Sequence, residues 1–203
     1  MHYYPIETKT LKKILFAKKF IEHLALEGIE YNYCIKHKEV LGCDQSKEYY
    51  QRFSYYIGNE NEYCICKNLL VQERKGEKRK FLIIVSDEKQ VDLKTLKDTY
   101  ELKKLEFISQ EDMEKFLHTE PGNVSLFNLQ YDHENKLEVF FDEELLQEKQ
   151  LAFHPLYNGM SLFLKPQEAL KFVDSIGHSY KVISIPKKEE IGYKKQKILT
   201  KSI

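Results

Sequence analysis

The stretch YCICKNLLVQERKGEKRKFLIIVS, residues 63–86, decides the fold, because it holds two apolar runs joined by a charged turn. Residues 63–72 and 80–86 have the length and composition of β-strands. Residues 73–79 between them are polar and contain Gly76 near their centre, as expected of a turn between antiparallel strands. The sequence therefore predicts a β-hairpin at this point of the chain.

Lys67 is the first residue of this hairpin that suggests chemistry. A lysine flanked by Ile65, Leu69 and Leu70 must extend its ammonium group to solvent or meet a specific anion. A lysine on an edge strand that reaches solvent explains the pattern as well as an anion site does. The residue alone therefore leaves both interpretations open.

The rest of the chain mixes helical and strand-like patterns. We expect helices at about 10–27, 46–57, 92–100, 109–118, 143–148 and 166–176, and strands at 29–35, 105–108, 123–129, 137–141, 151–153, 161–164 and 180–185. Residues 123–129 and 137–141 are expected to pair with each other. Because strands and helices do not alternate regularly, the pattern predicts an α+β fold with antiparallel pairs.

Composition limits the classes of protein that fit. The 203 residues are 42 % hydrophobic, enough for one large domain with a core, or for a domain with a tail. Lys and Arg total 32, as do Asp and Glu, so the formal net charge is zero. A protein that coats nucleic acid non-specifically is usually basic, so any RNA contact must come from a local patch and a shaped pocket.

The termini and the cysteines indicate an intracellular setting. Residues 1–10 lack the apolar segment of a signal peptide, and no apolar run has the roughly 18 residues of a membrane span. We therefore expect a cytoplasmic protein without disulfides or a membrane partner. Cys64 and Cys66 lack the two-residue spacing of common zinc ligands, so core packing is favoured over a metal site.

The composition changes after Pro186. Residues 187–190 and 194–197 are strongly charged and have few apolar neighbours. We therefore expect one domain over residues 1–186 and a charged tail or linker over residues 187–203.

Four segments, taken in order, resemble the YbaK and prolyl-tRNA-synthetase-associated domain family. Residues 66–71 (CKNLLV) match a C-K-N-L-F-L strand, and residues 104–107 (KLEF) stand where relatives have R-L-S-F. Residues 120–127 (EPGNVSLF) resemble x-P-G-S-V-S-P-F, and residues 153–158 (FHPLYN) match F-H-P-L-x-N. The similarity extends over about residues 11–186 and is nearest to the ProX-like branch of free-standing alanyl-tRNA(Pro) editing proteins.

This resemblance implies a fold and an activity. The fold would be a mixed, largely antiparallel curved sheet with surrounding helices. The activity would be translation proofreading by an aminoacyl-tRNA ester hydrolase that removes alanine from mischarged proline tRNA, with no cofactor and no DNA partner. Two contexts are open: a free-standing protein, which acts beside prolyl-tRNA synthetase, or an appended domain of that ligase. The alternative function is a catalytically weak module of the same fold that binds tRNA or docks on a synthetase.

The resemblance also implies site residues. Lys67 takes the place of the family's catalytic lysine, which would bind the terminal phosphate or ribose and steady charge on the ester carbonyl, and Asn68 beside it would bind substrate. His154 would line the aminoacyl pocket or orient a water, although a lone histidine is often satisfied inside a fold. Asn158 would hold the same loop or donate to the substrate, where plain turn chemistry is the alternative.

The remaining implied contacts are on loops and basic residues. The family's glycine turn corresponds to Gly122, Asn123, Val124 and Ser125, whose N–H groups would hold an oxyanion or the substrate carbonyl, with a plain tight turn as the alternative. His37 would lie at the pocket mouth or simply on the surface. Lys104 would contact a phosphate. The turn with Arg74, Lys75, Lys78, Arg79 and Lys80 would touch the acceptor stem or remain solvated.

Three departures from the family pattern affect these expectations. Leu126 replaces a proline and Asn128 replaces a glycine, so we expect either that loss of the proline loosens the pocket or that Leu126 narrows or reshapes it. The prolines that usually follow the histidine are absent after His37. Alanine, cysteine and other small amino acids therefore stay open as the amino acid removed.

Overall fold

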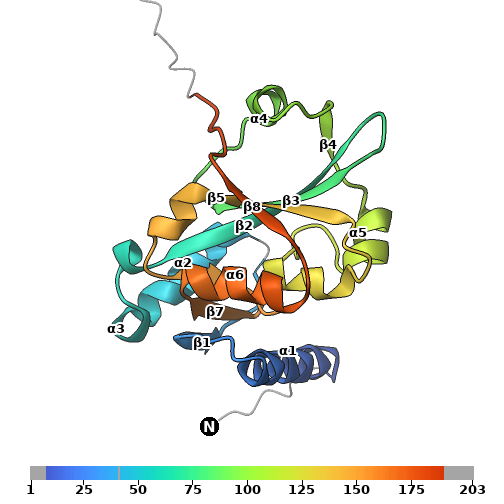
Figure 1. Cartoon of the computed structure of the whole chain (residues 1–203). Helices are drawn as coiled ribbons and strands as arrows, with labels where there is room; N and C mark the ends of the chain where they lie inside the picture. Colours follow the sequence, from blue (N-terminus) through green and yellow to red (C-terminus); the bar gives the residue numbers. More distant parts are fainter. Residues whose placement is uncertain (1–7, 41, 190–203) are drawn as a thin grey trace, which may run out of the picture.

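The computed structural model describes residues 8–40 and 42–189, so residues 190–203 of the expected tail lie outside the described part of the chain. Its strands form one mixed sheet with helices around it (Figure 1). The strands are β1 (Tyr33–Lys36), β2 (Cys64–Glu73), β3 (Lys80–Ser86), β4 (Leu105–Phe107), β5 (Leu137–Asp142), β6 (Leu151–Phe153), β7 (Met160–Leu164) and β8 (Tyr180–Ile183).

The helices lie close to their expected positions, except that the single helix expected at 46–57 begins earlier and is divided into α2 and α3. The α-helices are α1 (Thr8–Leu26), α2 (Cys43–Arg52), α3 (Ser54–Ile57), α4 (Leu93–Thr99), α5 (Gln110–Leu117) and α6 (Pro166–Ser175). The 3-10 helices are η1 (Glu60–Glu62), η2 (Leu126–Tyr131) and η3 (Glu143–Gln147). Asp92 and Ser109, which begin the helices expected at 92–100 and 109–118, accept hydrogen bonds from first-turn N–H groups and cap α4 and α5.

The sheet order is β1-β7-β6-β2-β3-β5-β8, and β4 pairs with β2 outside this path. The expected hairpin is confirmed: β2 and β3 pair antiparallel from Cys66 opposite Ser86 to Gln72 opposite Lys80. The pairs β1–β7, β2–β4 and β6–β7 are also antiparallel, whereas β2–β6, β3–β5 and β5–β8 are parallel. The fold is therefore α+β with a mixed, largely antiparallel sheet, as expected.

The prediction of a strand over residues 123–129 is wrong. Residues 126–131 form η2, and β5 pairs in parallel with β3 and β8 instead. The reason is local: the Ser125 hydroxyl accepts from the Phe127 N–H, and the Asn128 side chain accepts from the Ser125 N–H. This capping box begins a helix, and apolar side chains of η2 are buried without the alternation of a half-buried strand.

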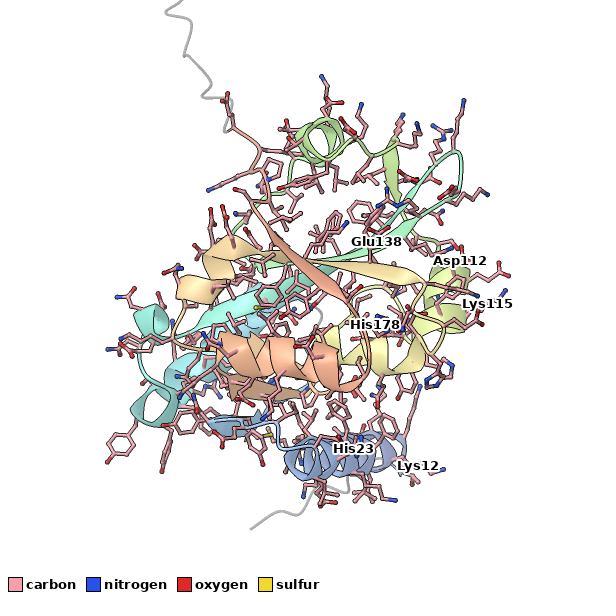
Figure 2. The ribbon with its side chains drawn as sticks, in the orientation of Figure 1. Lys12, His23, Asp112, Lys115, Glu138 and His178 are labelled. Carbon is pink, nitrogen blue, oxygen red and sulfur yellow. The ribbon has the colours of Figure 1, made fainter. Side chains whose placement is uncertain are left out.

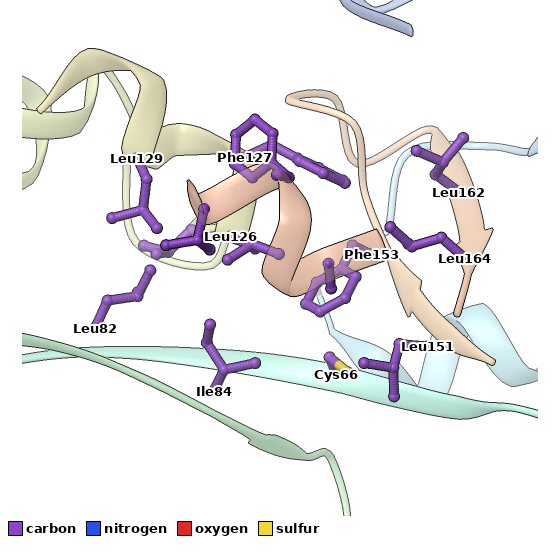
Figure 3. Packing of buried hydrophobic residues seen from close by; sticks show 14 of the residues in the cluster. Cys66, Leu82, Ile84, Leu126, Phe127, Leu129, Leu151, Phe153, Leu162 and Leu164 are labelled. Atoms are coloured by element: carbon purple, nitrogen blue, oxygen red, sulfur yellow. The ribbon is translucent and has the colours of Figure 1, made fainter. Parts of the chain in front are cut away.

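The main core lies between one face of the sheet and the helices α1, α6 and η2. Leu82, Ile84 and Cys66 point from β3 and β2 towards Phe127 and Phe153 (Figure 3). Cys64 belongs to the same core, so the expectation that these two cysteines pack in a core is confirmed. Charged side chains such as Lys12 on α1 and Lys115 on α5 are exposed and project from the surface (Figure 2).

One feature of β2 decides where a site can form. On one edge β2 pairs with β6 at Cys64–Ile65 and with β4 at Val71–Glu73. Residues 66–70 lie between these two partners, and on their opposite edge they pair with β3. The sheet therefore has a gap beside the segment that contains Lys67 and Asn68.

The turn that follows β3 is fixed by a buried ion pair. The Lys89 ammonium lies 2.6 Å from the Asp142 carboxylate and 2.7 Å from the Glu144 carboxylate, and it donates to the Ile185 carbonyl at 3.1 Å. The side chains of Lys89 and Asp142 are 6 % and 1 % exposed. This cluster ties the turn to β5, η3 and the segment after β8.

Replacing Lys89 should destabilise the fold strongly, because Lys89→Met leaves the Asp142 carboxylate buried without its partner. We expect a loss of about 3 kcal/mol in the free energy of unfolding, measured by urea denaturation. Lys149→Met is the matched control, since Lys149 forms an exposed pair with Glu62 and should cost about 1 kcal/mol or less. Equal losses in the two variants would contradict this interpretation.

Candidate active site

A cavity of about 550 Å³ occupies the gap beside β2. Its wall includes residues 65–70 of β2, the start of α2, and the segments that contain His37, Gly122 and His154. Of the residues singled out in the sequence, seven line it: His37, Lys67, Asn68, Gly122, Val124, His154 and Asn158. Segments far apart in the sequence thus meet where the sheet leaves β2 unpaired.

Lys67 is half-buried in the cavity wall. Its ammonium group donates a hydrogen bond of 2.8 Å to the main-chain carbonyl of Asp87. Burial lowers the pKa of Lys67, and the negative charge of the Asp87 carboxylate opposes that shift. Lys67 is therefore a cation held at the cavity by a neutral acceptor, with donors left for an anionic or carbonyl ligand.

Asn68 presents polar groups to the gap. Along β2 the carbonyl of Ile65 accepts from Asp87 beyond β3, whereas the carbonyl of Leu70 accepts from Ile108 beyond β4. Main-chain groups alternate sides along a strand, so the N–H and C=O of Asn68 are directed towards the gap. Its side-chain Oδ1 is buried and has no hydrogen-bond partner within the described part of the chain.

His154 follows β6 and lines the same cavity. Burial lowers the pKa of His154 to about 4, a shift that the Val124 carbonyl opposes and the nearby His37 increases. The imidazole is therefore neutral at pH 7, and its Nδ1 is buried without a hydrogen-bond partner among the described residues. A neutral ring of such low basicity can position a ligand or a water, but it cannot supply a proton at neutral pH.

His37 is buried in the wall, so the surface alternative is wrong. Its Nδ1 lies 2.7 Å from the Lys38 carbonyl and its Nε2 lies 2.8 Å from the Ser161 hydroxyl. The Tyr50 hydroxyl donates to the same Ser161 oxygen at 2.7 Å. A carbonyl oxygen can only accept, so Nδ1 carries the ring proton and donates it to Lys38. Nε2 of the neutral ring then accepts from the Ser161 hydroxyl, and both ring nitrogens are occupied. Sequence reasoning missed Ser161 and Tyr50, because no motif links them to His37.

Asn158 holds the segment that contains His37. Its side-chain amide donates to the Val40 carbonyl at 2.7 Å, and the N–H of Val40 donates to the Asn158 carbonyl at 3.2 Å. The N–H of His37 donates to the Gly159 carbonyl at 2.9 Å. Of the two roles expected for Asn158, these contacts favour the loop anchor, because one of the two N–H groups of its amide is committed to the Val40 carbonyl.

The glycine turn supplies fewer free donors than expected. The N–H of Asn123 donates to the Glu120 carbonyl, and the N–H of Ser125 donates to Asn128 Oδ1. The Ser125 hydroxyl donates to the His154 carbonyl at 2.8 Å, so Ser125 joins the turn to His154. Asn123 and Ser125 do not line the cavity, whereas Gly122, with φ of 85°, and Val124 do.

One further expectation needs correction, and the phosphate contact expected of Lys104 stays a prediction. Leu126 is buried in the main core and does not line the cavity, so it does not narrow the pocket. Asn128 braces the turn, because its amide nitrogen donates to the Leu117 carbonyl at 3.1 Å while its oxygen holds Ser125. Lys104 does not line the cavity either. It precedes β4 beside the β2–β3 turn, where its carbonyl accepts from Arg74, because β4 runs away from the gap at that end.

Two kinds of chemistry have little support in this wall. Cys43 lines the cavity, but burial, with the negative charge of Asp87, raises the pKa of its thiol to about 11, so no thiolate forms at pH 7. Within residues 8–40 and 42–189, no group of three or more His, Cys, Asp and Glu side chains could hold a metal ion.

Over the same residues, no helix has the length and apolar character that a membrane crossing requires.

The low pKa of His154 makes a testable contribution to stability. The unfolded chain binds a proton near pH 6.5 that the folded chain binds only near pH 4. The free energy of unfolding of the native protein should therefore fall, relative to His154→Gln, by up to about 3 kcal/mol as the pH drops through this window. Urea unfolding of both proteins between pH 7 and pH 4 measures the difference. A difference that does not change with pH would contradict the burial of a neutral His154.

Comparison with known proteins agrees with this geometry. The model of the aminoacyl-tRNA editing domain matches residues 50–172. A prolyl-tRNA editing protein, ProX, from Acetoanaerobium sticklandii is 30 % identical over 161 residues, which are 79 % of this chain and 93 % of that protein.

Solved structures share the fold at low sequence identity. The crystal structure of the hypothetical protein APE2540 has a TM-score of 0.60 and 14 % identity, with 81 % of this chain and 97 % of that chain covered. A candidate trans-editing enzyme for prolyl tRNA synthetase has a TM-score of 0.57 and 16 % identity, with 84 % and 98 % covered. The match to the domain model and the identity to ProX show more than the fold: this chain belongs to the aminoacyl-tRNA editing domain family, a family of hydrolases.

Proposed function

We propose that this protein is an editing deacylase that hydrolyses the ester of alanine mistakenly attached to proline tRNA. Membership of the editing family supports the reaction class, and the similarity to ProX supports the tRNA. The observation that carries the proposal is the cavity in the gap of the sheet, where Lys67 and the main chain of Asn68 meet. These groups match an uncharged ester that acquires negative charge as it reacts.

The proposed chemistry needs little from the protein, because an aminoacyl ester is already activated. Water adds to the ester carbonyl, the carbon–oxygen bond to the ribose breaks, and the products are free alanine and the tRNA with its ribose hydroxyl restored. Such a reaction requires orientation of the ester and donors directed at its carbonyl oxygen. The N–H of Asn68 and the ammonium group of Lys67 are the proposed donors.

The histidines have positioning roles in this proposal. His154 is neutral at pH 7 and has a buried nitrogen without a partner among the described residues, so it can hold the attacking water or the amino group. His37 has both nitrogens occupied and forms a fixed part of the wall. In this proposal neither ring donates a proton to the leaving ribose oxygen. The adjacent ribose hydroxyl can donate that proton instead.

Selection by size explains why such an activity is needed. A synthetase rejects an amino acid smaller than its own only weakly, since each missing methylene changes binding by about 1–3 kcal/mol. A second, smaller site can hydrolyse the small product and exclude the correct one. The cavity wall here is fixed by buried contacts of His37, Asn158 and Ser125, which suits a site that discriminates by size.

The domain organisation and the partners belong to the same proposal. Residues 1–186 form the editing domain and residues 187–203 a charged tail or linker, and the partner is the acceptor end of mischarged proline tRNA in the cytoplasm. Prolyl-tRNA synthetase is the proposed protein partner, in cis or in trans. The departures that motivated a purely tRNA-binding module lose force, since Leu126 lies in the core and Asn128 braces the turn.

The direct test is hydrolysis of alanyl-, cysteinyl- and prolyl-tRNA(Pro) by the purified protein. We expect rapid release of alanine and slow or no release of proline, because a site that selects by size would admit the smaller amino acid and reject the larger ring. Release of each amino acid is followed with labelled substrates beside a reaction without enzyme. Rates equal to the uncatalysed rates for all three substrates would refute the proposal, and faster release of cysteine would refute the choice of alanine.

Loss of the Lys67 charge should impair the reaction more than folding. We expect Lys67→Met to lower kcat by about 10²–10³-fold, the usual effect of removing one donor that faces a developing oxyanion. Lys165→Met is the control, because Lys165 is exposed at the start of α6 and does not line the cavity. Unchanged kcat in Lys67→Met, with thermal unfolding like that of the native protein, would remove Lys67 from the reaction.

A further inference from the structure

Phe107 is an exposed aromatic residue at the cavity. Its side chain is 61 % exposed, although it stands at the end of β4, and it lines the cavity beside β2. Scattered exposed aromatics are common on protein surfaces. In α3, however, Tyr55 and Tyr56 are similarly or more exposed and line none of the cavity. Phe107 therefore combines an accessible ring with a place at the proposed reaction site.

The register of the sheet puts Phe107 on the same face as Lys67. Side chains two residues apart on a strand point to the same face, so Lys67, Leu69 and Val71 share one face of β2. Val71 stands directly opposite Phe107 in the β2–β4 pair, and opposed residues also share a face. Lys67 and Val71, the residue opposite Phe107, are therefore four residues apart along β2, or about 13 Å between their backbone positions.

The floor between these two residues is apolar. Leu69 lies between them on the same face, lines the cavity and is partly buried. The opposite face at this point carries Asn68 and Leu70, which also line the cavity. A ligand whose ester lies at Asn68 and Lys67 can thus extend over Leu69 towards the ring of Phe107.

We propose that Phe107 is the stacking platform for the terminal adenine of the tRNA, with Leu69 as the apolar floor beneath the ribose. The inference rests on the proposed deacylase function and adds a nucleobase subsite to it. A flat aromatic side chain at a solvent-open edge is the usual partner of an unpaired base, and such stacking contributes about 1–3 kcal/mol for each base. The long side chain of Lys67 spans the remaining distance to the ribose and the ester.

The subsite also explains how a protein with no net charge could hold a tRNA end. Bulk electrostatic attraction is weak when acidic and basic residues are equal in number, as they are here at 32 each. A stacking contact with a base common to all tRNA ends binds without excess positive charge. Other surfaces of the protein would then select proline tRNA, and Phe107 would contribute only to the affinity for the tRNA end.

The test uses 3′-deoxy-3′-(L-alanylamino)adenosine, in which an amide replaces the ester, so binding is measured without hydrolysis. By calorimetry, we expect Phe107→Ala and Phe107→Leu to raise Kd by about 5–150-fold, and Phe107→Trp to bind like the native protein. Tyr56→Ala is the matched control, because Tyr56 is 62 % exposed and lies in α3 outside the cavity. A similar ribose alanylamide without the base should bind Phe107→Ala and native protein equally.

The outcomes separate this inference from the proposed function. The stacking platform would be overturned by a native-like Kd for the adenosine probe in Phe107→Ala or in Phe107→Leu. It would also be overturned if the native protein did not bind this probe. Hydrolysis of alanyl-tRNA(Pro) that survives in Phe107→Ala with unchanged KM would overturn it as well, while leaving the deacylase intact. Conversely, base-dependent binding through Phe107 without hydrolysis of any charged tRNA would support the subsite and refute the deacylase.

Discussion

The unpaired segment of β2 is the constraint on which the rest of the structure depends. β6 and β4 pair with the same edge of β2 at its two ends, and among residues 8–40 and 42–189 no strand pairs with residues 66–70 on that side. Main-chain polar groups directed into such a gap must be met by water, by other parts of the chain or by a ligand. The cavity thus lies where the pairing of the sheet is interrupted beside β2.

Contacts around the gap keep it open and in shape. On one side the carbonyl of Asp87 holds the Lys67 ammonium group, and the turn after β3 is in turn fixed by the buried Lys89 and Asp142 pair. On the other side Ser125 joins the glycine turn to His154, and Asn158 joins the loop after β6 to the segment of His37. Within the described part of the chain these polar wall residues are satisfied by one another, whereas Lys67, Asn68 and His154 retain capacity for a ligand.

Much of this could be predicted from the sequence, but unevenly. The hairpin, the caps of α4 and α5 and the helix that begins at Pro166 follow from local rules, and they appear as expected. The segment 123–129 does not, because a capping box at Ser125 and Asn128 outweighs its apolar, strand-like composition. Family motifs brought seven of the ten proposed site residues to the cavity, and they failed for Asn123, Ser125 and Lys104, whose roles depend on hydrogen bonds and on the direction of β4. Ser161 and Tyr50 have no sequence signal of their own, and Phe107 falls in a family motif that does not by itself place its ring at the site, since only the sheet register does so.

The central claim is that the aminoacyl end of a tRNA binds in the gap beside β2. A crystal structure of the protein with 3′-deoxy-3′-(L-alanylamino)adenosine tests it most directly. We expect the alanyl carbonyl oxygen within about 3 Å of the Asn68 N–H and near the Lys67 ammonium group, where an oxyanion would be stabilised. A ligand bound instead in the shallow groove lined by Lys13, His118 and Tyr157, with the gap left unoccupied, would contradict the account.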